Sequence, residues 1–103
     1  MPEENIPDKN NKKRLEQHDT GDSEHMYVKV YSPYNTYFDG IAKSISAEND
    51  TGPFDILPRH HKFMTLLNPG TLTVRNDEKV EDLQINRGIM HVKEDRVTVF
   101  LDV

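Results

Sequence analysis

The chain has 103 residues, of which 34% are hydrophobic and 30% are charged, so it has room for one small domain with a single core. Its formal net charge of −5 argues against a general nucleic-acid-binding protein, which needs a basic face. The absence of cysteine excludes disulfides and thiolate chemistry. No apolar run approaches the roughly 18 residues of a membrane span, and no secretory signal is evident, so we expect a cytoplasmic protein without direct membrane insertion.

Residues 1–25 differ in composition from the rest of the chain. Pro, Asn, Glu, Asp and Lys dominate this segment, and only Met1, Ile6 and Leu15 are apolar. Such a segment cannot bury enough apolar surface to offset the entropy lost on ordering, so we predict a disordered polar tail. Its basic triplet, residues 12–14, is interpreted as a solvated run of charge in preference to a site for an acidic partner or lipid head groups.

From Met26 onward, apolar residues recur at every second position, which is the period of a β-strand. The first predicted strand is Tyr27–Tyr31, with its two valines on one face, and it ends in turn residues at 32–35. A second short strand, Thr36–Phe38, is closed by the turn dipeptide Asp39-Gly40. Residues 41–47 alternate as a third strand, with these residues on one side: Ile41, Lys43, Ile45 and Ala47.

The stretch Asn49–Gly70 holds the densest apolar cluster and many of the turn signals. Pro58 and Pro69 end two short apolar runs, which we expect to be buried. The runs are Phe54, Ile56 and Leu57, then Phe63, Met64, Leu66 and Leu67. A polar, basic corner, residues 59–62, lies between them.

The remaining third of the chain also reads as strands. Residues 71–75 alternate, 76–79 form a polar hairpin loop, and a change of phase within 80–85 predicts a β-bulge near Glu81-Asp82. Strands at 89–92 and 97–101 flank a last turn at 93–96. Eight to ten short strands at this spacing indicate an all-β fold, an antiparallel sandwich or flattened barrel over residues 26–103.

Five histidines raise the question of a metal site. His60 and His61 are adjacent, so an extended backbone would point them to opposite sides, and no histidine pair has ligand spacing. The sequence has no nucleophile motif and no phosphate-binding loop, and its acidic pairs lie in or beside turns. We therefore expect no metal, no cofactor and no catalytic residue.

Aromatic residues concentrate near the first two strands, and either core cover or a protein-binding surface explains them. Phe100 points away from the inward-facing Val97, Val99 and Leu101. It is therefore expected either to contact a neighbouring chain or to lie under a loop.

Several motifs point to one family. Asp39-Gly40, the stretch GPFDILPRH at 52–60 and the turn at 68–70 resemble, in order and spacing, the signature of the N-terminal β-sandwich domain of the epsilon subunit of F-type ATP synthases (delta in mitochondria). Residues 85–92 and 96–102 resemble two later motifs of that domain. The resemblance covers residues 27–103.

The chain also departs from the family pattern. Asp55 and Arg59 stand where the family has glycine, and His61-Lys62 stands where it has Ala-Pro. The chain ends at Val103, where full-length subunits continue into a helical hairpin that carries their inhibitory movement and, in some members, an ATP-binding motif. Neither property is therefore carried over by the resemblance.

The resemblance implies a non-catalytic rotor subunit of the central stalk, which links the gamma subunit to the membrane rotor ring in proton-coupled ATP synthesis. The assembled protein would lie at the inner face of the membrane, and we expect a monomer when it is isolated. By position, the loop at Asn49, Asp50, Thr51, Gly52, Pro53 and Phe54 would face the rotor ring. His60 would lie near gamma. The neighbouring Arg59 and His61 would need acidic partners there, or the contact with gamma is different. The alternative is a free-standing interaction module outside the synthase.

Overall fold

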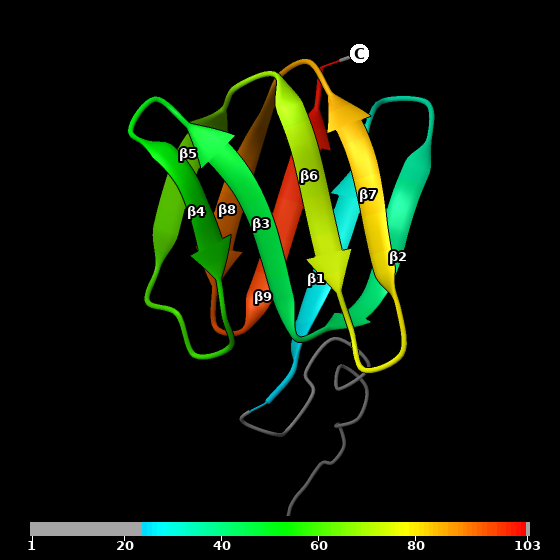
Figure 1. The fold of residues 1–103 in the computed structure, drawn as a ribbon, viewed down its shortest axis with the longest axis vertical. Coiled ribbons are helices and arrows are strands. Elements are labelled where there is room, and N and C mark those ends of the chain that lie inside the picture. Colours follow the sequence, from blue (N-terminus) through cyan, green and yellow to red (C-terminus); the bar gives the residue numbers. More distant parts are fainter. Residues whose placement is uncertain (1–23, 103) are drawn as a thin grey trace, which may run out of the picture.

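The computed structural model describes residues 24–102, which form nine strands in two sheets packed face to face (Figure 1). The five-stranded sheet has the order β2-β1-β9-β8-β5, and the four-stranded sheet has the order β4-β3-β6-β7. The strands are β1 (Met26–Tyr31), β2 (Thr36–Ala42), β3 (Ser44–Asn49), β4 (Gly52–Ile56), β5 (Phe63–Leu67), β6 (Gly70–Arg75), β7 (Val80–Ile85), β8 (Gly88–Lys93) and β9 (Arg96–Leu101). The predicted all-β sandwich is confirmed. The predicted tail lies, except for its last two residues, outside the described part of the chain.

The core lies between the two sheets and receives side chains from all nine strands. Alternation along each strand places every second side chain inward, so that Val28, Leu72, Met90 and Val99 are fully buried. Phe38, Phe54, Phe63 and Leu83 pack at the margin of this core. Within residues 24–102 no helix is long and apolar enough to cross a membrane.

One strand pair departs from the predicted antiparallel arrangement. β1 pairs with β2 in antiparallel fashion on one side and with β9 in parallel fashion on the other. The first and last strands of the domain are thus neighbours in one sheet. The remaining pairs in the described chain are antiparallel: three join consecutive strands through short turns, and the other two, β3–β6 and β5–β8, join strands that are not consecutive.

The turn predicted at Asp39-Gly40 is wrong. β2 runs through both residues, and Gly40 pairs with Val28 in the ladder. The Tyr27 hydroxyl on β1 donates a hydrogen bond to the Asp39 carboxylate on the outer face of the sheet. Strand pairing across the sheet therefore overrides the local turn preference of this dipeptide.

The chain changes sheets at Lys43, so the single strand predicted at 41–47 is also wrong. Crossing between sheets reverses the face that points to the core. Ala42 and Ile45 are therefore both buried, although they are an odd number of positions apart (three), whereas Ile41 is 41% exposed. The Lys43 amide donates to the Arg75 carbonyl oxygen at 2.7 Å and fixes this crossing.

The β-bulge predicted near Glu81-Asp82 is wrong as well. β7 pairs with β6 without a shift of register from Val80 to Ile85. Val80 simply lies on the outer face, where it is 59% exposed, so Leu83 and Ile85 keep a regular alternation. A register shift is found instead between Val30 and Tyr31, where β1 meets β2.

Gly88 tests how closely β9 packs against β8 within the five-stranded sheet. A Cβ atom at this position would lie 2.9 Å from both the Leu101 Cδ2 atom and the Phe100 backbone oxygen, which is too close to accept without a shift of β9. We expect Gly88→Ala to lower the free energy of unfolding by about 1–3 kcal/mol. The matched control is Gly40→Ala, whose Cβ would meet only the Phe38 ring at 3.7 Å and which should change stability by less than about 1 kcal/mol. Urea unfolding followed by circular dichroism measures both, and equal losses would contradict the packing described.

Candidate functional site

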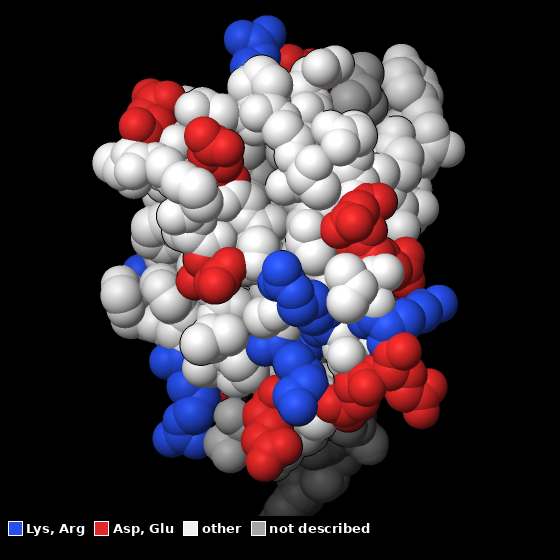
Figure 2. All heavy atoms as spheres, viewed as in Figure 1, with Lys and Arg blue, Asp and Glu red and all other residues white. Residues whose placement is uncertain are grey.

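The two outer faces of the sandwich differ in chemistry. The outer face of the four-stranded sheet is polar, and its side chains bond to one another: Ser46 donates to Asp55 at 2.5 Å, and Thr73 donates to Asp82 at 2.8 Å. The Arg75 guanidinium donates to the Ser46 hydroxyl at 2.6 Å. Figure 2 shows Lys and Arg interspersed with Asp and Glu on this face. These groups already have partners within the chain, so this face has little need of another protein.

The outer face of the five-stranded sheet carries a continuous apolar surface. Leu66 on β5 pairs with Ile89 on β8, which pairs with Phe100 on β9, which pairs with Tyr31 on β1. Directly paired residues share one face of a sheet, so these side chains form a row across four adjacent strands. Met64 precedes Leu66 on the same face of β5. We call these five residues the apolar row.

The apolar row is open to solvent. Leu66 is 69% exposed, Met64 64%, Ile89 44% and Phe100 37%. The Phe100 ring meets the Tyr31 ring edge to face, with 5.2 Å between their centroids. Phe100 therefore points outward as predicted, and part of its cover comes from Tyr31 of the same chain, not from a loop. A contiguous exposed patch of this kind marks an interaction surface more often than scattered single residues do.

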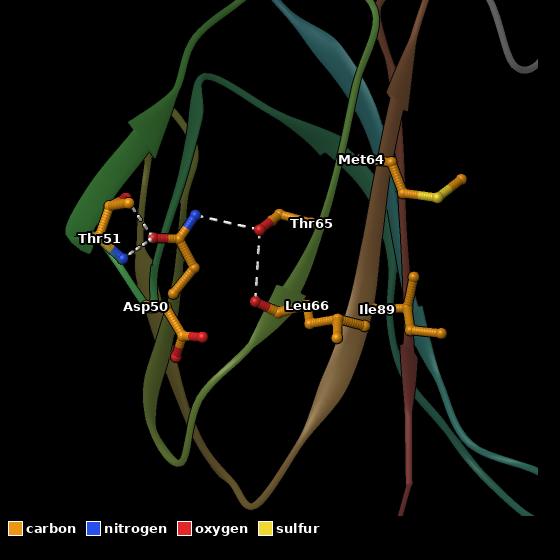
Figure 3. Close-up of a pocket in the computed structure, with 7 residues that line it drawn as sticks. Asp50, Thr51, Met64, Thr65, Leu66 and Ile89 are labelled. Atoms are coloured by element: carbon orange, nitrogen blue, oxygen red, sulfur yellow. Dashed lines mark hydrogen bonds between the residues drawn. The ribbon is translucent and has the colours of Figure 1, made fainter.

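Two shallow hollows border the apolar row. One, of about 480 Å³, is drawn in Figure 3, and its lining combines the β3–β4 hairpin with the row: Asn49, Asp50, Thr51, Met64, Thr65, Leu66 and Ile89. The other, of about 460 Å³, is lined by Leu66, Leu67, Arg87, Gly88, Ile89, Phe100 and Asp102. Three residues predicted to contact a partner, Asn49 to Thr51, thus lie beside exposed apolar side chains.

Asn49 holds the hairpin against β5. Its side-chain oxygen accepts hydrogen bonds from the Thr51 amide at 2.9 Å and the Thr51 hydroxyl at 2.7 Å, while its amide nitrogen donates to the Thr65 hydroxyl at 3.0 Å (Figure 3). Gly52 completes the turn with a φ of 119°, which side chains disfavour. Asp50 and Thr51 are exposed at its tip, while Phe54 packs edge to face against Phe63 at 5.8 Å.

The other three predicted contact residues lie at the opposite end of the sandwich. β4 separates the β3–β4 hairpin from the corner at Arg59, His60 and His61 (Figure 1). Five residues of strand span about 17 Å. Arg59 has a φ of 68°, and its backbone N–H donates to the Asp95 carboxylate at 2.6 Å in the β8–β9 turn. The nine predicted residues therefore form two groups.

His60 and His61 do not point to opposite sides, contrary to the prediction. Their rings stack, with centroids 4.4 Å apart and an interplanar angle of 22°, and His60 Nδ1 lies 2.8 Å from the His61 carbonyl oxygen. The prediction assumed extended backbone, whereas these residues lie in a loop that follows the left-handed Arg59. Among residues 24–102, no three His, Cys, Asp or Glu side chains are arranged to hold a metal ion.

The expectation that both apolar runs of the Asn49–Gly70 stretch are buried is only partly right. Ile56 and Leu67 are buried, but Leu57, Met64 and Leu66 are mostly exposed. The missed signal was alternation: once Leu67 faces inward, Met64 and Leu66 must share the outer face. Ile89 was also missed, because only strand pairing places it beside Leu66.

A separate polar cluster lies where β1 begins. His25 Nε2 is 3.0 Å and Lys43 Nζ is 3.5 Å from the carboxylate of Asp77. The hydrogen bond from His25, together with these positive charges, holds the pKa of Asp77 below its ordinary value. The cluster joins the sheet crossing to the β6–β7 turn, and we regard it as structural.

Tyr27 yields a prediction about alkaline pH. Burial, followed by the hydrogen bond to the Asp39 carboxylate, raises the pKa of Tyr27 from 10.0 to about 12. The neutral phenol is thus favoured in the folded state, and its contribution to stability is present below pH 10.0 and lost as the pH rises through about 12. Between these two pH values, we expect the free energy of unfolding of Tyr27→Phe to fall less steeply with rising pH than that of the wild type. Urea unfolding below, within and above this pH range measures both slopes, and equal slopes would contradict the prediction.

The sequence and fold correspond to a known family. A family model for the β-sandwich domain of the ATP synthase delta/epsilon chain matches residues 25–103, and the chain belongs to this family. The ATP synthase epsilon chain of Acidithiobacillus ferridurans is 36% identical over 75 residues, which are 73% of this chain and 53% of that protein. The epsilon chain of Ruthia magnifica is 34% identical over 77 residues, 75% of this chain and 56% of that protein. The chain thus spans little more than half the length of these relatives.

Solved structures share the same fold. A chain from the cryo-EM structure of the Tetrahymena thermophila mitochondrial ATP synthase central stalk and c-ring is similar with a TM-score of 0.65 and 22% identity, over 76% of this chain and 63% of that one. A chain from the Euglena gracilis mitochondrial ATP synthase is similar with a TM-score of 0.71 and 18% identity, over 76% of this chain and 51% of that one.

Proposed function

We propose that this protein is a non-catalytic central-stalk subunit of an F-type ATP synthase that links the gamma subunit to the membrane rotor ring. The observation that carries the proposal is membership of residues 25–103 in the delta/epsilon β-sandwich family. Relatives that match over three quarters of the chain are named ATP synthase epsilon chains. In the assembled state the protein would sit at the inner, cytoplasmic face of the membrane and support proton-coupled ATP synthesis.

The surface chemistry supports a linking role. The apolar row offers a face whose burial stabilises a complex, since fully burying one large aliphatic side chain contributes about 1.5–3 kcal/mol. The tip of the β3–β4 hairpin, at Asp50 and Thr51, is polar and exposed. We assign the apolar row to gamma and the hairpin tip to the polar loops of the rotor ring.

The basic corner, residues 59–62, bears on which side chains the gamma subunit must present. Arg59, His61 and Lys62 are exposed, and the Arg59 backbone is fixed by Asp95. Charged groups at the rim of an interface favour a partner of opposite sign. We therefore propose that the gamma subunit that accepts this protein presents acidic side chains to this corner.

Affinity purification from native membranes tests the assignment. The full chain, tagged and expressed in its own cells, should be recovered with gamma and the other synthase subunits after detergent extraction. Recovery as free protein, or only with unrelated partners, would overturn the proposal. Unrelated partners would favour the second candidate, a free-standing interaction module, which is suggested by the chain's own residues at Asp55, Arg59, His61 and Lys62.

A further inference from the structure

The four edge strands of the sandwich differ in how they are protected against pairing with other chains. An edge strand exposes unpaired backbone groups, and proteins commonly blunt such edges with charges, proline or irregularities. β4 carries Pro53, β7 carries Glu81 and Asp82, and β2 carries Asp39 and Gly40. β5, with the sequence FMTLL, carries no charge, proline or glycine. Within the described chain it is the edge with no sequence protection.

The free side of β5 presents backbone groups at Met64 and Leu66. The Asp102 amide donates to the Arg87 carbonyl oxygen at 3.1 Å, so Ile89, two positions after Arg87, also bonds towards β9. The intervening residues of β8 bond towards β5, and Met90 is the one that pairs with Thr65. The N–H and C=O groups of one strand residue point to the same side, and neighbouring residues alternate. Met64 and Leu66 are therefore the residues whose donors and acceptors face outward, and Thr65 is bonded towards β8.

The sequence of β5 is complementary to itself in antiparallel orientation. It reads apolar, apolar, Thr, apolar, apolar, so a two-fold axis at Thr65 sets Met64 opposite Leu66 of a second copy and Phe63 opposite Leu67. Met64 and Leu66 are 64% and 69% exposed, so each outer pair covers two exposed apolar side chains. The backbone groups of Met64 and Leu66 also meet in this register.

The charges at the two ends of β5 suit the same arrangement. The exposed Asp50 lies in the hairpin beside one end of β5, and the exposed Lys62 directly precedes the other end. Antiparallel pairing brings the acidic hairpin of one copy towards the basic corner of the other. Both ends of the interface then contain charges of opposite sign.

We infer that the free protein pairs with a second copy of itself through antiparallel β5–β5 contact centred on Thr65, which joins the two five-stranded sheets into one. This inference differs from the monomer expected from sequence. The pairing covers Met64 and Leu66 of the apolar row. The pairing leaves Ile89, Phe100 and Tyr31 of the row open, and it does not depend on the proposed function.

Cysteine cross-linking tests the register, because the chain contains no cysteine of its own. In the inferred pair Thr65 faces Thr65 at a non-hydrogen-bonded position, where Cβ atoms are about 4.5–5.5 Å apart, near the reach of a disulfide. Full-length Thr65→Cys should form several-fold more covalent dimer under mild oxidation than Thr36→Cys, which places an exposed cysteine on the β2 edge. Equal cross-linking of the two variants would overturn the inference.

Light scattering across a range of concentrations gives the second measurement. With increasing concentration, the average mass of the wild type and of Val80→Lys should rise towards twice the mass of one chain. The average mass of Leu66→Lys should stay at that of one chain. Both substitutions replace an exposed apolar residue on an edge strand with the same charge, and circular dichroism verifies folding. A wild type that is monomeric at every concentration overturns the pairing whether or not the protein co-purifies with a synthase. Failure to co-purify, in turn, leaves the pairing intact.

Discussion

Leu72→Ala is expected to lower the free energy of unfolding by about 2–5 kcal/mol. Leu72 on β6 is 0% exposed and lies in the layer between the two sheets. The substitution would remove three carbon atoms from the core and leave a cavity. The neighbouring strands are held by their hydrogen-bonded ladders, so they can fill this cavity only in part. Because small domains have a total stability of about 5–15 kcal/mol, this single change would remove a large share of it.

Leu66→Ala is the matched control for this prediction. It makes the same chemical change on a strand of similar length, but Leu66 is 69% exposed, so its truncation should cost less than about 1 kcal/mol. Urea unfolding at one protein concentration, low enough for the chain to be monomeric, with comparable m-values, gives both differences. Losses of equal size would mean that the inward and outward faces have been assigned incorrectly.

Much of the core was predictable because a strand's alternation is a local property. In β1 and β9 the valines alternate with polar or aromatic residues, and Val28, Val30, Val97 and Val99 are all buried. A slip of one residue would expose each of these sets, so the pattern alone specifies which face points inward. Hairpin loops were predictable for a similar reason: at 76–79, the Asn76 side chain accepts from the amides of Glu78 and Lys79.

The sheet crossing at Lys43 was not predictable from such patterns. Ile41 and Ala42 are adjacent apolar residues, and either one would serve as the inward residue of a local strand. The choice is made by non-local pairing: Gly40 aligns with Val28 on β1, while Ile45 aligns with Val74 on β6. Period alone contains no information about which partner strand a segment will join.

The candidate site shows the same division between local and non-local information. The hairpin at Asn49–Thr51 was expected from the resemblance, and its turn chemistry is local. Its neighbours Leu66 and Ile89 are brought beside it by the β5–β8 ladder, which joins residues more than twenty positions apart. The apolar row is a product of register, and no single segment of the sequence displays it.

Ile89→Glu is expected to weaken binding to the gamma subunit by about 100-fold, which corresponds to about 3 kcal/mol. Ile89 occupies the middle of the apolar row, between Leu66 on β5 and Phe100 on β9. In the proposed complex the new carboxylate would be buried among the apolar side chains of the row, and burying a charge is costly. Because Ile89 is 44% exposed in the free protein, the substitution should leave the free energy of unfolding within about 1 kcal/mol of the wild type.

Val80→Glu separates this effect from that of added negative charge. Val80 is 59% exposed on the outer face of the four-stranded sheet, so the variant has the same net charge as Ile89→Glu but leaves the apolar row unchanged. Calorimetric titration of both variants against purified gamma should show near wild-type affinity for Val80→Glu and the large loss for Ile89→Glu. Equal affinities would place gamma elsewhere on the sandwich, and absence of binding by the wild type would count against the stalk assignment itself. Because Ile89 lies one strand in from the free edge, a selective loss would also distinguish docking across the face of the sheet from strand pairing at β5.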